Sequence, residues 1–371
     1  MTAPRIAPTD LDFVLRETAG LWPEARGARF FITGGTGFFG CWLLETLVHA
    51  NRTLGLGMTA TVLTRDPGRF ARKAPHLAGA EGVDLTAGRM EDMSGVAGRF
   101  DFALHAATET NPDRPGSGLD FSRLKGGRPD PDRVDPRDLV ERDIAGTEQF
   151  LGVVRRSGVR KLLFTSSGAV YGPQPAGLPL VAEDSGLAPD PVDPRSANGE
   201  AKRVSELLCT LEGGAEAKIA RCFSFVGPHL PLDANYAVGN FIRDAVAGGP
   251  LRIAGDGTPV RSYLYGADLA VWLWTVLFRG AHGRAYNVGS EEGISILGLA
   301  ELVRATVAPV AEITVAKAAI PWSRPSRFLP STLRARSELG LRVGTGLAEA
   351  IRRTAEWSRA AAAHIPQFST S

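Results

Sequence analysis

The stretch TGGTGFFG, residues 33–40, decides the fold. It places Gly34, Gly37 and Gly40 at three-residue spacing, after a short β-rich run and before a segment with the apolar spacing of a helix. Glycine lets a backbone approach a pyrophosphate closely, and a helix N-terminus offers unpaired N–H groups and a positive dipole end. Tight packing alone also explains a glycine triplet. Between a first strand and a helix, however, the triplet predicts a dinucleotide-binding loop.

Strand-like and helix-like segments alternate beyond this loop. Helical segments separate apolar, strand-like runs at residues 58–64, 83–88, 100–107, 160–167 and 217–225. Strands that alternate with helices form a parallel sheet with helices on both faces. The predicted fold class is therefore α/β: a Rossmann-type doubly wound parallel sheet with a smaller C-terminal substrate lobe.

The chain divides into three predicted parts. Residues 1–27 form an N-terminal helical extension, with a helix over residues 9–22 that begins at a Thr/Asp cap. Residues 28–225 form the NAD(P)-binding Rossmann domain, with a surface insertion rich in Pro, Gly and charge at about 109–136. Residues 226–371 form a mixed α/β substrate-binding lobe, and part of this C-terminal segment packs back on the Rossmann domain.

The composition is that of an ordinary soluble protein. Of 371 residues, 44% are hydrophobic and 22% charged, and the net charge of +2 indicates neither a nucleic-acid nor a membrane partner. The 3 cysteines have no CxxC spacing, so neither a metal site nor a disulfide framework is indicated. There is no signal-peptide pattern and no run near the roughly 18 apolar residues of a membrane span. A cytoplasmic location is expected.

Several motifs in a fixed order carry a family resemblance. Besides the glycine loop, these are HAA at 105–107, TSSGAVYG at 165–172, and GPHLP, NFI, GDGTPVRSYLYGADLA and YNVGS after residue 225. The chain resembles the extended short-chain dehydrogenases/reductases, in their sugar-nucleotide epimerase and dehydratase branch, over nearly all of residues 28–360. The resemblance implies a tightly held NAD(P)+ and a transiently oxidised sugar carbon, so that the overall reaction is redox-neutral.

The resemblance also implies the catalytic residues. Ser167 holds the reacting oxygen, and Lys202 binds the nicotinamide ribose and lowers the pKa of a tyrosine four residues before it. In SANGEAKR, residues 196–203, that position is Asn198. An amide does not titrate near neutral pH and cannot act as a general base. Since a positioned acid/base contributes roughly 10²- to 10⁴-fold, Tyr171, a water or the substrate itself would have to replace it.

Further residues are assigned by the same resemblance. The cofactor-binding set is Gly34, Thr36, Gly37, Phe38, Phe39, Gly40, Thr64, Arg65, Ala106, Ala107 and Lys202. The substrate-binding set is Ser224, Asn240 and Arg261. The guanidinium of Arg261 suits the substrate phosphates. Arg65 fits the 2′-phosphate of NADP, adenine stacking or plain solvation, so NAD versus NADP stays open.

Other positions depart from the family pattern. Asp143 and Ser224 stand where the family has asparagines, and Arg89 stands where it has an acidic residue. Gly168 and Ala169 replace the Asp-Glu pair with which 4,6-dehydratases expel a hydroxyl. The absence of that pair disfavours the standard dehydratase mechanism.

Three hypotheses about function follow. The first is an active epimerase or dehydratase of a nucleotide sugar or nucleoside-like sugar, with an atypical Asn198. The second is an ordinary family enzyme whose tyrosine was engineered to Asn198, and the third is a catalytically silent cofactor-binding partner protein. The resemblance also implies a homodimer through the helices at 137–154 and 199–211, although their apolar stripes equally suit a core.

Overall fold

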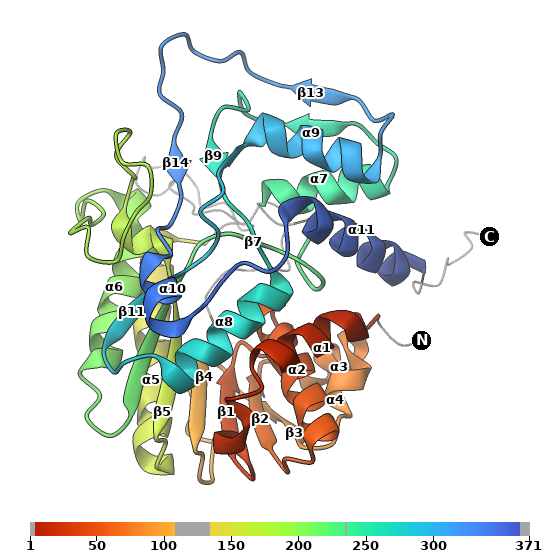
Figure 1. Ribbon diagram of the computed structural model, residues 1–371. Helices are drawn as coiled ribbons and strands as arrows, with labels where there is room; N and C mark the ends of the chain where they lie inside the picture. The colour runs from red at the N-terminus through yellow and green to blue at the C-terminus, as the bar shows by residue number, and fades with distance from the viewer. Residues whose placement is uncertain (1–3, 108–133, 234–235, 364–371) are drawn as a thin grey trace.

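A seven-stranded parallel sheet forms the centre of the protein. The computed structural model describes residues 4–107, 134–233 and 236–363 (Figure 1). The sheet has the order β11-β6-β5-β4-β1-β2-β3, and every neighbouring pair is parallel. Its strands are β1 (Arg29–Thr33), β2 (Thr59–Thr64), β3 (Val83–Ala87), β4 (Phe102–His105), β5 (Lys161–Ser167), β6 (Glu216–Cys222) and β11 (Arg284–Val288). The predicted Rossmann-type sheet is confirmed.

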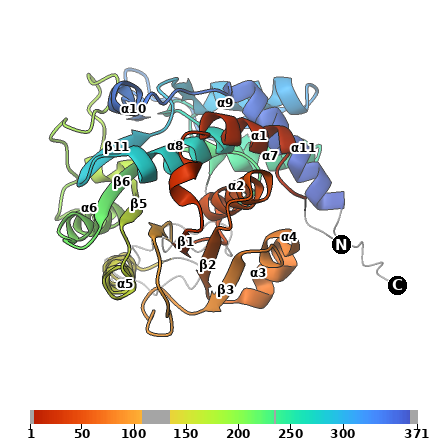
Figure 2. The same ribbon diagram turned by 60° about the horizontal axis from the view of Figure 1, so that its bottom comes forward.

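Helices cover both faces of this sheet. In Figure 2, α5 and α6 lie on one side of the strands, and α1, α2 and α8 lie on the other. The helices are α1 (Pro8–Glu17), α2 (Phe38–Leu54), α3 (Pro67–Lys73), α4 (Pro75–Ala78), α5 (Pro136–Ser157), α6 (Ala197–Thr210), α7 (Ala237–Val246), α8 (Gly266–Arg279), α9 (Ile296–Val307), α10 (Leu333–Leu339) and α11 (Leu347–Ala363). Short 3-10 helices are η1 (Trp22–Ala25), η3 (Gly168–Tyr171) and η4 (Pro194–Ser196).

Strand β1 shows why the sheet is buried on both faces. Successive strand residues point to opposite faces. Phe30 and Ile32 accordingly join the hydrophobic cluster that includes Trp42 of α2, while Phe31 joins a second cluster with Phe150 of α5. All of these side chains are fully buried. The continuous apolar run is therefore that of a central parallel strand.

The C-terminal part contributes to the central sheet. The sequence assigned residues 286–290 to the substrate-lobe segments, but β11 pairs with β6, with Tyr286 opposite Ala220. The reason is that this apolar strand covers the open edge of β6. Smaller sheets are formed by β7 (Phe225–Val226) with β10 (Leu264–Tyr265), by β8 (Leu251–Ile253) with β13 (Ile313–Val315), and by β9 (Val260–Arg261) with β12 (Ile294–Ser295) and β14 (Arg327–Phe328). The domain boundary at 225 stays a prediction.

The N-terminal helix is shorter and more buried than predicted. It ends at Glu17, and its N-cap is Ala7, without a side-chain cap. Asp10 is instead buried, accepts a hydrogen bond from the Tyr265 hydroxyl at 2.6 Å and pairs with Arg353. The helix is thereby tied to α8 and α11.

Most of the predicted insertion, residues 108–133, lies outside the described residues. Among the helices that are described, none is long and apolar enough to cross a membrane.

Candidate active site

The glycine loop joins β1 to α2 by backbone packing that excludes side chains. Gly34 has φ +70°, and a Cβ there would lie 2.4 Å from the carbonyl carbon of Ala106 and 2.5 Å from the nitrogen of Ala107. A Cβ on Gly40 would lie 2.3 Å from the carbonyl oxygen of Gly34. The loop, the end of β4 and the first turn of α2 are therefore in direct backbone contact. Packing within the protein itself requires two of the three glycines.

Gly37 differs, because nothing in the described protein excludes a side chain there. Its φ is −83°, and a Cβ would meet only the Gly34 oxygen, at an ordinary 3.4 Å. Gly37 is exposed and forms the N-cap of α2 without a side-chain cap, so the first-turn N–H groups of α2 are open to a ligand. A glycine at this point fits the close approach of a pyrophosphate to a helix N-terminus. The loop therefore has the features that a dinucleotide needs.

The residues around the loop lie at the same edge of the sheet. Phe38 and Phe39 are half-buried, and Phe39 packs on Phe225 with ring centroids 4.9 Å apart. The Thr36 carbonyl accepts a hydrogen bond from Lys73 Nζ at 2.7 Å. Thr64 ends β2 and is buried, whereas the Arg65 side chain is exposed. Arg65 is thus free to meet an adenosine ribose, but its position does not distinguish NAD from NADP.

The predicted catalytic segment follows β5 directly. The Ser167 hydroxyl accepts a hydrogen bond from the Ala169 N–H at 3.1 Å and so caps η3. Helix α6 starts against this turn, because a Cβ on Gly199 would lie only 2.5 Å from the Ala169 carbonyl oxygen. Asn198 is the residue before Gly199. Ser167, Asn198 and Lys202 are therefore gathered at the carboxyl edge of the sheet, on neighbouring elements.

Lys202 has a buried partner that the sequence did not assign. Its Nζ lies 3.0 Å from Asp143 Oδ2 and 5.2 Å from the centre of the Phe164 ring. The exposed fraction is only 4% for Lys202 and 2% for Asp143. Asn198, one helical turn earlier, is half-buried, and its amide makes no hydrogen bond within the described residues. The ammonium group is therefore paired with α5 and not with position 198.

His105, at the end of β4, is a buried neutral ring near Lys202. Its Nδ1 lies 2.7 Å from Thr33 Oγ1, and its ring stacks on Phe150 at 4.7 Å. Burial, together with nearby Lys202, lowers the pKa of His105 to about 3. This histidine therefore links β1 to β4 and is not a proton acceptor near neutral pH. Over the ranges that the structure describes, no group of three His, Cys, Asp or Glu side chains is arranged to hold a metal ion.

Tyr171, a predicted substitute base, is locked in a polar network. Its hydroxyl donates to Asn287 Oδ1 at 2.7 Å and accepts from Arg221 at 3.0 Å, and Arg221 pairs with Glu206 at 2.7 Å. Burial raises the pKa of Tyr171 to about 12, although Arg221 opposes the rise. A phenol with so high a pKa is a poor base near neutral pH. Its catalytic role stays a prediction, and this environment counts against it.

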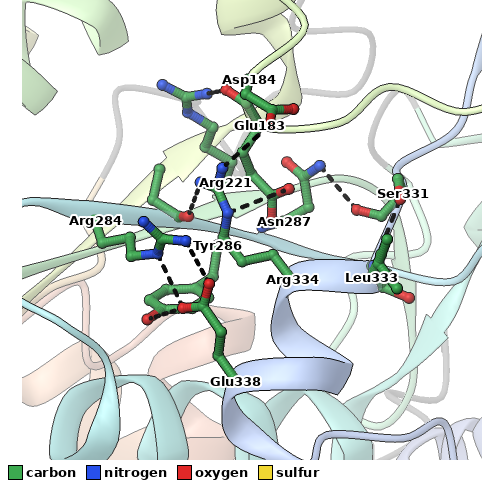
Figure 3. A network of polar contacts seen from close by, with 12 residues as sticks. Glu183, Asp184, Arg221, Arg284, Tyr286, Asn287, Ser331, Leu333, Arg334 and Glu338 are labelled. Atoms are coloured by element: carbon green, nitrogen blue, oxygen red, sulfur yellow. Dashed lines mark hydrogen bonds and ion pairs between the residues drawn. The ribbon is translucent and has the colours of Figure 1, made fainter.

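The network continues toward the C-terminal part of the chain. Figure 3 shows Arg221, Glu183 and Asn287 converging, and the Asn287 N–H donates to Glu183 Oε1 at 2.8 Å. The Asn287 side chain donates to the Ser331 carbonyl at 3.0 Å, and Arg334 lies 3.9 Å from Glu183. These contacts bind η3, β6 and β11 to the segment before α10. They fix the backbone that carries Ser167.

Two arginines lie on adjacent short strands near this segment. Arg261 of β9 stands opposite Phe328 of β14, and the Phe328 ring reaches within 2.7 Å of where a Cβ of Gly168 would lie. Arg327 precedes Phe328, and its buried Nε has no hydrogen-bond partner within the described residues. Within the described residues, Arg261 donates only to the carbonyls of Val260 and Ser326. Arg327 pairs with Val260, so the alternation of side chains along a strand places Arg327 and Arg261 on opposite faces of this small sheet. The sequence did not single out Arg327, because the pairing of β9 with β14 is not visible in it.

The other two predicted substrate residues are less directly placed. Ser224 follows Phe223, whose ring packs on that of Phe328 with centroids 4.6 Å apart. The Ser224 carbonyl accepts a hydrogen bond from the Leu264 N–H. Asn240 is on α7, and its side-chain oxygen accepts from Arg243 at 3.2 Å. In the described ranges, neither residue hydrogen-bonds to the catalytic segment. Their substrate contacts stay predictions.

Comparison with known proteins shows which protein family the matched part of the chain resembles. Residues 126–289 match the model of the NAD dependent epimerase/dehydratase family. UDP-glucuronic acid decarboxylase 2 of Arabidopsis thaliana is 29% identical over 294 residues, which are 78% of this chain and 59% of that protein. UDP-glucuronic acid decarboxylase 1 of Xenopus tropicalis is 27% identical over 334 residues, 89% of this chain and 72% of that protein. The chain thus spans less than two thirds of the length of the Arabidopsis relative.

Solved structures share the fold. An epimerase from Methanothermobacter thermautotrophicus has a TM-score of 0.70 at 20% identity and covers 95% of this chain and 96% of its own. The dTDP-glucose 4,6-dehydratase of Streptomyces venezuelae, solved with NAD and TYD, has a TM-score of 0.68 at 23% identity and covers 89% and 97%. Sheet order and glycine loop define an α/β protein of the Rossmann class. Within it, residues 126–289 match the NAD dependent epimerase/dehydratase family, in agreement with the resemblance that the motifs predicted.

Proposed function

We propose that this chain is an NAD(P)-dependent, redox-neutral enzyme that transiently oxidises a sugar hydroxyl of a nucleotide sugar or nucleoside-like sugar. The observation that carries the proposal is the gathering of Ser167, Asn198 and Lys202 at the sheet edge beside the glycine loop. A bound nicotinamide dinucleotide supplies a reversible hydride acceptor. Ligands of open α/β sheets bind at this edge, where the strand order reverses between β1 and β4.

The residues of this chain then have separate tasks. Gly37 and the first turn of α2 hold the pyrophosphate, and Lys202 positions the nicotinamide ribose. Ser167 holds the reacting oxygen, while Asn198 orients it by hydrogen bonding without taking its proton. The proton passes to water or to the substrate, since the phenol of Tyr171 is held by Asn287 and has a raised pKa.

Arg261 supports an anionic substrate. Within the described residues its guanidinium donates to two backbone carbonyls through one nitrogen, and its other N–H groups suit the contacts of a phosphate. The rings of Phe223 and Phe328 fill the space beside Gly168, where the dehydratase acid would stand. Epimerisation therefore fits this site better than 4,6-dehydration. Decarboxylation, the reaction named for the relatives from Arabidopsis and Xenopus, is the second candidate.

The test is turnover with a substrate panel. The protein is incubated with NAD+ or NADP+ and with UDP-glucose, UDP-glucuronic acid or dTDP-glucose, and products and cofactor reduction are measured. Turnover by the unaltered chain is expected. We also expect Asn198→Tyr to raise turnover by less than about a hundredfold, because the surrounding site is arranged without a phenol.

Other outcomes select the other hypotheses. A gain of about a hundredfold or more in Asn198→Tyr, the lower range for a restored acid/base, indicates an ordinary enzyme with an altered tyrosine. Cofactor binding by both forms without reduction on any substrate indicates a silent partner protein.

We further propose that the chain forms a homodimer through α5 and α6, with no nucleic-acid or membrane partner, and that it works in the cytoplasm. Val204 and Leu207 of α6 and its C-cap residue Leu211 are exposed by 39%, 57% and 71% and repeat at helical spacing. Leu151 and Leu208 line a shallow groove with Leu211. An exposed apolar stripe along α6, next to α5, fits a second copy packed as a four-helix contact.

Replacing both Leu207 and Leu211 by aspartate is expected to convert the dimer to a monomer. The aspartates of each protomer would be buried against those of its partner across a two-fold interface, and burying unpaired charge is costly. Light scattering should show the mass fall by half. Val310→Asp, at a fully exposed position away from α6, is the matched control and should leave the mass unchanged. A monomeric unaltered chain contradicts the proposal.

A further inference from the structure

In the part of the chain that the structure describes, Lys202 has one available counter-ion. Asp143 Oδ2 lies 3.0 Å from Nζ in an ion pair, and neither oxygen of this carboxylate has a hydrogen-bond partner among the described residues. Both side chains are almost completely buried, so water does not screen the pair. The pair joins α5 to α6 at the level of the catalytic segment. The position of the ammonium is therefore set by α5.

The other titratable groups around Lys202 in the described residues are either neutral or already paired. Burial lowers the pKa of His105 to about 3, so its ring is neutral. Burial also raises the pKa of Cys209 to about 12 and raises that of Cys222, so both are neutral thiols. Glu206, one turn further along α6, is bound to Arg221 and accepts from Ser166 at 2.5 Å. Among the described residues, Asp143 is therefore the one left to balance the charge of Lys202.

We propose that Asp143 is the positioning residue that neutralises Lys202, so that the lysine holds a cofactor but does not activate a phenol at position 198. The inference rests on the proposed function and deepens it. An unpaired ammonium within about 4–6 Å lowers the pKa of a phenol by roughly 1–3 units, whereas a paired one acts as a much weaker dipole. The residues at positions 143 and 198 are then coupled. Because Asp143 on α5 supplies the negative charge that balances Lys202, the residue at position 198 does not have to ionise, and an asparagine is sufficient there.

A phenol titration tests this coupling without substrate or cofactor. The chain has 5 tyrosines, at positions 171, 236, 263, 265 and 286, and all have a raised pKa, mainly through burial. A new phenol at position 198 therefore ionises before the native ones and is followed by tyrosinate absorbance. We expect N198Y/D143N to ionise at least about one pH unit lower than N198Y, because only the double variant leaves the ammonium unpaired.

The control removes a carboxylate from the exposed side of the same helix. N198Y/E148Q loses one negative charge from α5 but keeps Asp143, and Glu148 is exposed. It should titrate like N198Y. Equal midpoints in N198Y and N198Y/D143N overturn the proposal. Because no turnover is measured, this result is independent of whether the proposed reaction occurs.

A stability cycle covers the case in which D143N folds poorly. D143N and K202M each leave one buried charge without its partner, whereas D143N/K202M removes both charges. We expect each single variant to lower Tm by several degrees and the double variant to recover most of that loss. A double variant whose loss equals the sum of the single losses contradicts the pairing on which the proposal depends.

Discussion

Gly40→Ala is expected to weaken nicotinamide dinucleotide binding by at least about a hundredfold and to lower the free energy of unfolding by about 3 kcal/mol. The added Cβ would lie 2.3 Å from the Gly34 oxygen and 2.3 Å from two backbone atoms of Gly35. Backbone atoms cannot rotate away as a side-chain end can. The loop must therefore move off α2, and the N–H groups that meet the pyrophosphate move with it.

Fluorescence titration with the dinucleotide and urea unfolding measure the two effects. Gly20→Ala is the matched control, since a Cβ at Gly20 meets no atom within 4 Å and the residue lies outside the loop. It should bind and unfold like the unaltered chain. If Gly40→Ala also does so, the contact between Gly34 and Gly40 is not what shapes the loop.

The strands of the central sheet could be predicted because each is a short apolar run between helical patterns. Residues 161–167 are an example, because they lie inside the run predicted at 160–167. Strand β11 was misassigned because its run, RAYNV, is short, and its sequence does not show which edge it joins. Periodicity reports which residues are buried, but not which strands are neighbours.

Asp143 and Arg327 show the same limit within the site. Asp143 was recognised as a departure from the family pattern, yet its pairing with Lys202 depends on the packing of α5 against α6. Arg327 lies 66 residues after Arg261 in the numbering, and only the pairing of β9 with β14 shows that the two residues lie on neighbouring strands. The glycine loop was predictable because its chemistry is contained in eight consecutive residues, 33–40.

A buried polar cluster outside the site contributes to the pH dependence of stability. Glu45 of α2 lies 2.6 Å from His76 of α4 and 3.5 Å from His229, which has φ +68°. Burial would raise the pKa of Glu45, but the two histidines outweigh it and lower the pKa to about 2. Burial would lower the pKa of His229, but contacts with Cys41 and Glu45 raise it to about 9.

The two shifts predict a stability maximum between pH 4.5 and 6.5, the ordinary pKa values of the two groups. The lowered pKa of Glu45 stabilises the fold above pH 4.5, and this contribution is lost as pH falls toward about 2. The raised pKa of His229 stabilises the fold below pH 6.5, and this contribution is lost as pH rises toward about 9. The contact between Glu45 and His229 enters both shifts, while Cys41 also raises the pKa of His229 and His76 also lowers the pKa of Glu45. The loss on either side is therefore about 3 kcal/mol, and the two losses do not simply add.

Glu45→Gln is expected to lower the free energy of unfolding at pH 6 by about 3–5 kcal/mol, because it leaves His229 charged or neutral without its buried partner. Urea unfolding between pH 4 and 9 should then give a profile flatter than that of the unaltered chain. Asp12→Asn is the matched control: Asp12 and His49 form a similar pair at 2.8 Å, but the Asp12 side chain is 65% exposed. Solvent screening limits that pair to about 0–1 kcal/mol. If the free energy of unfolding of Glu45→Gln changes with pH in parallel with that of the unaltered chain, the pH dependence arises elsewhere. The Glu45 carboxylate, which links α2, α4 and the loop at His229, would then make no pH-dependent contribution to stability.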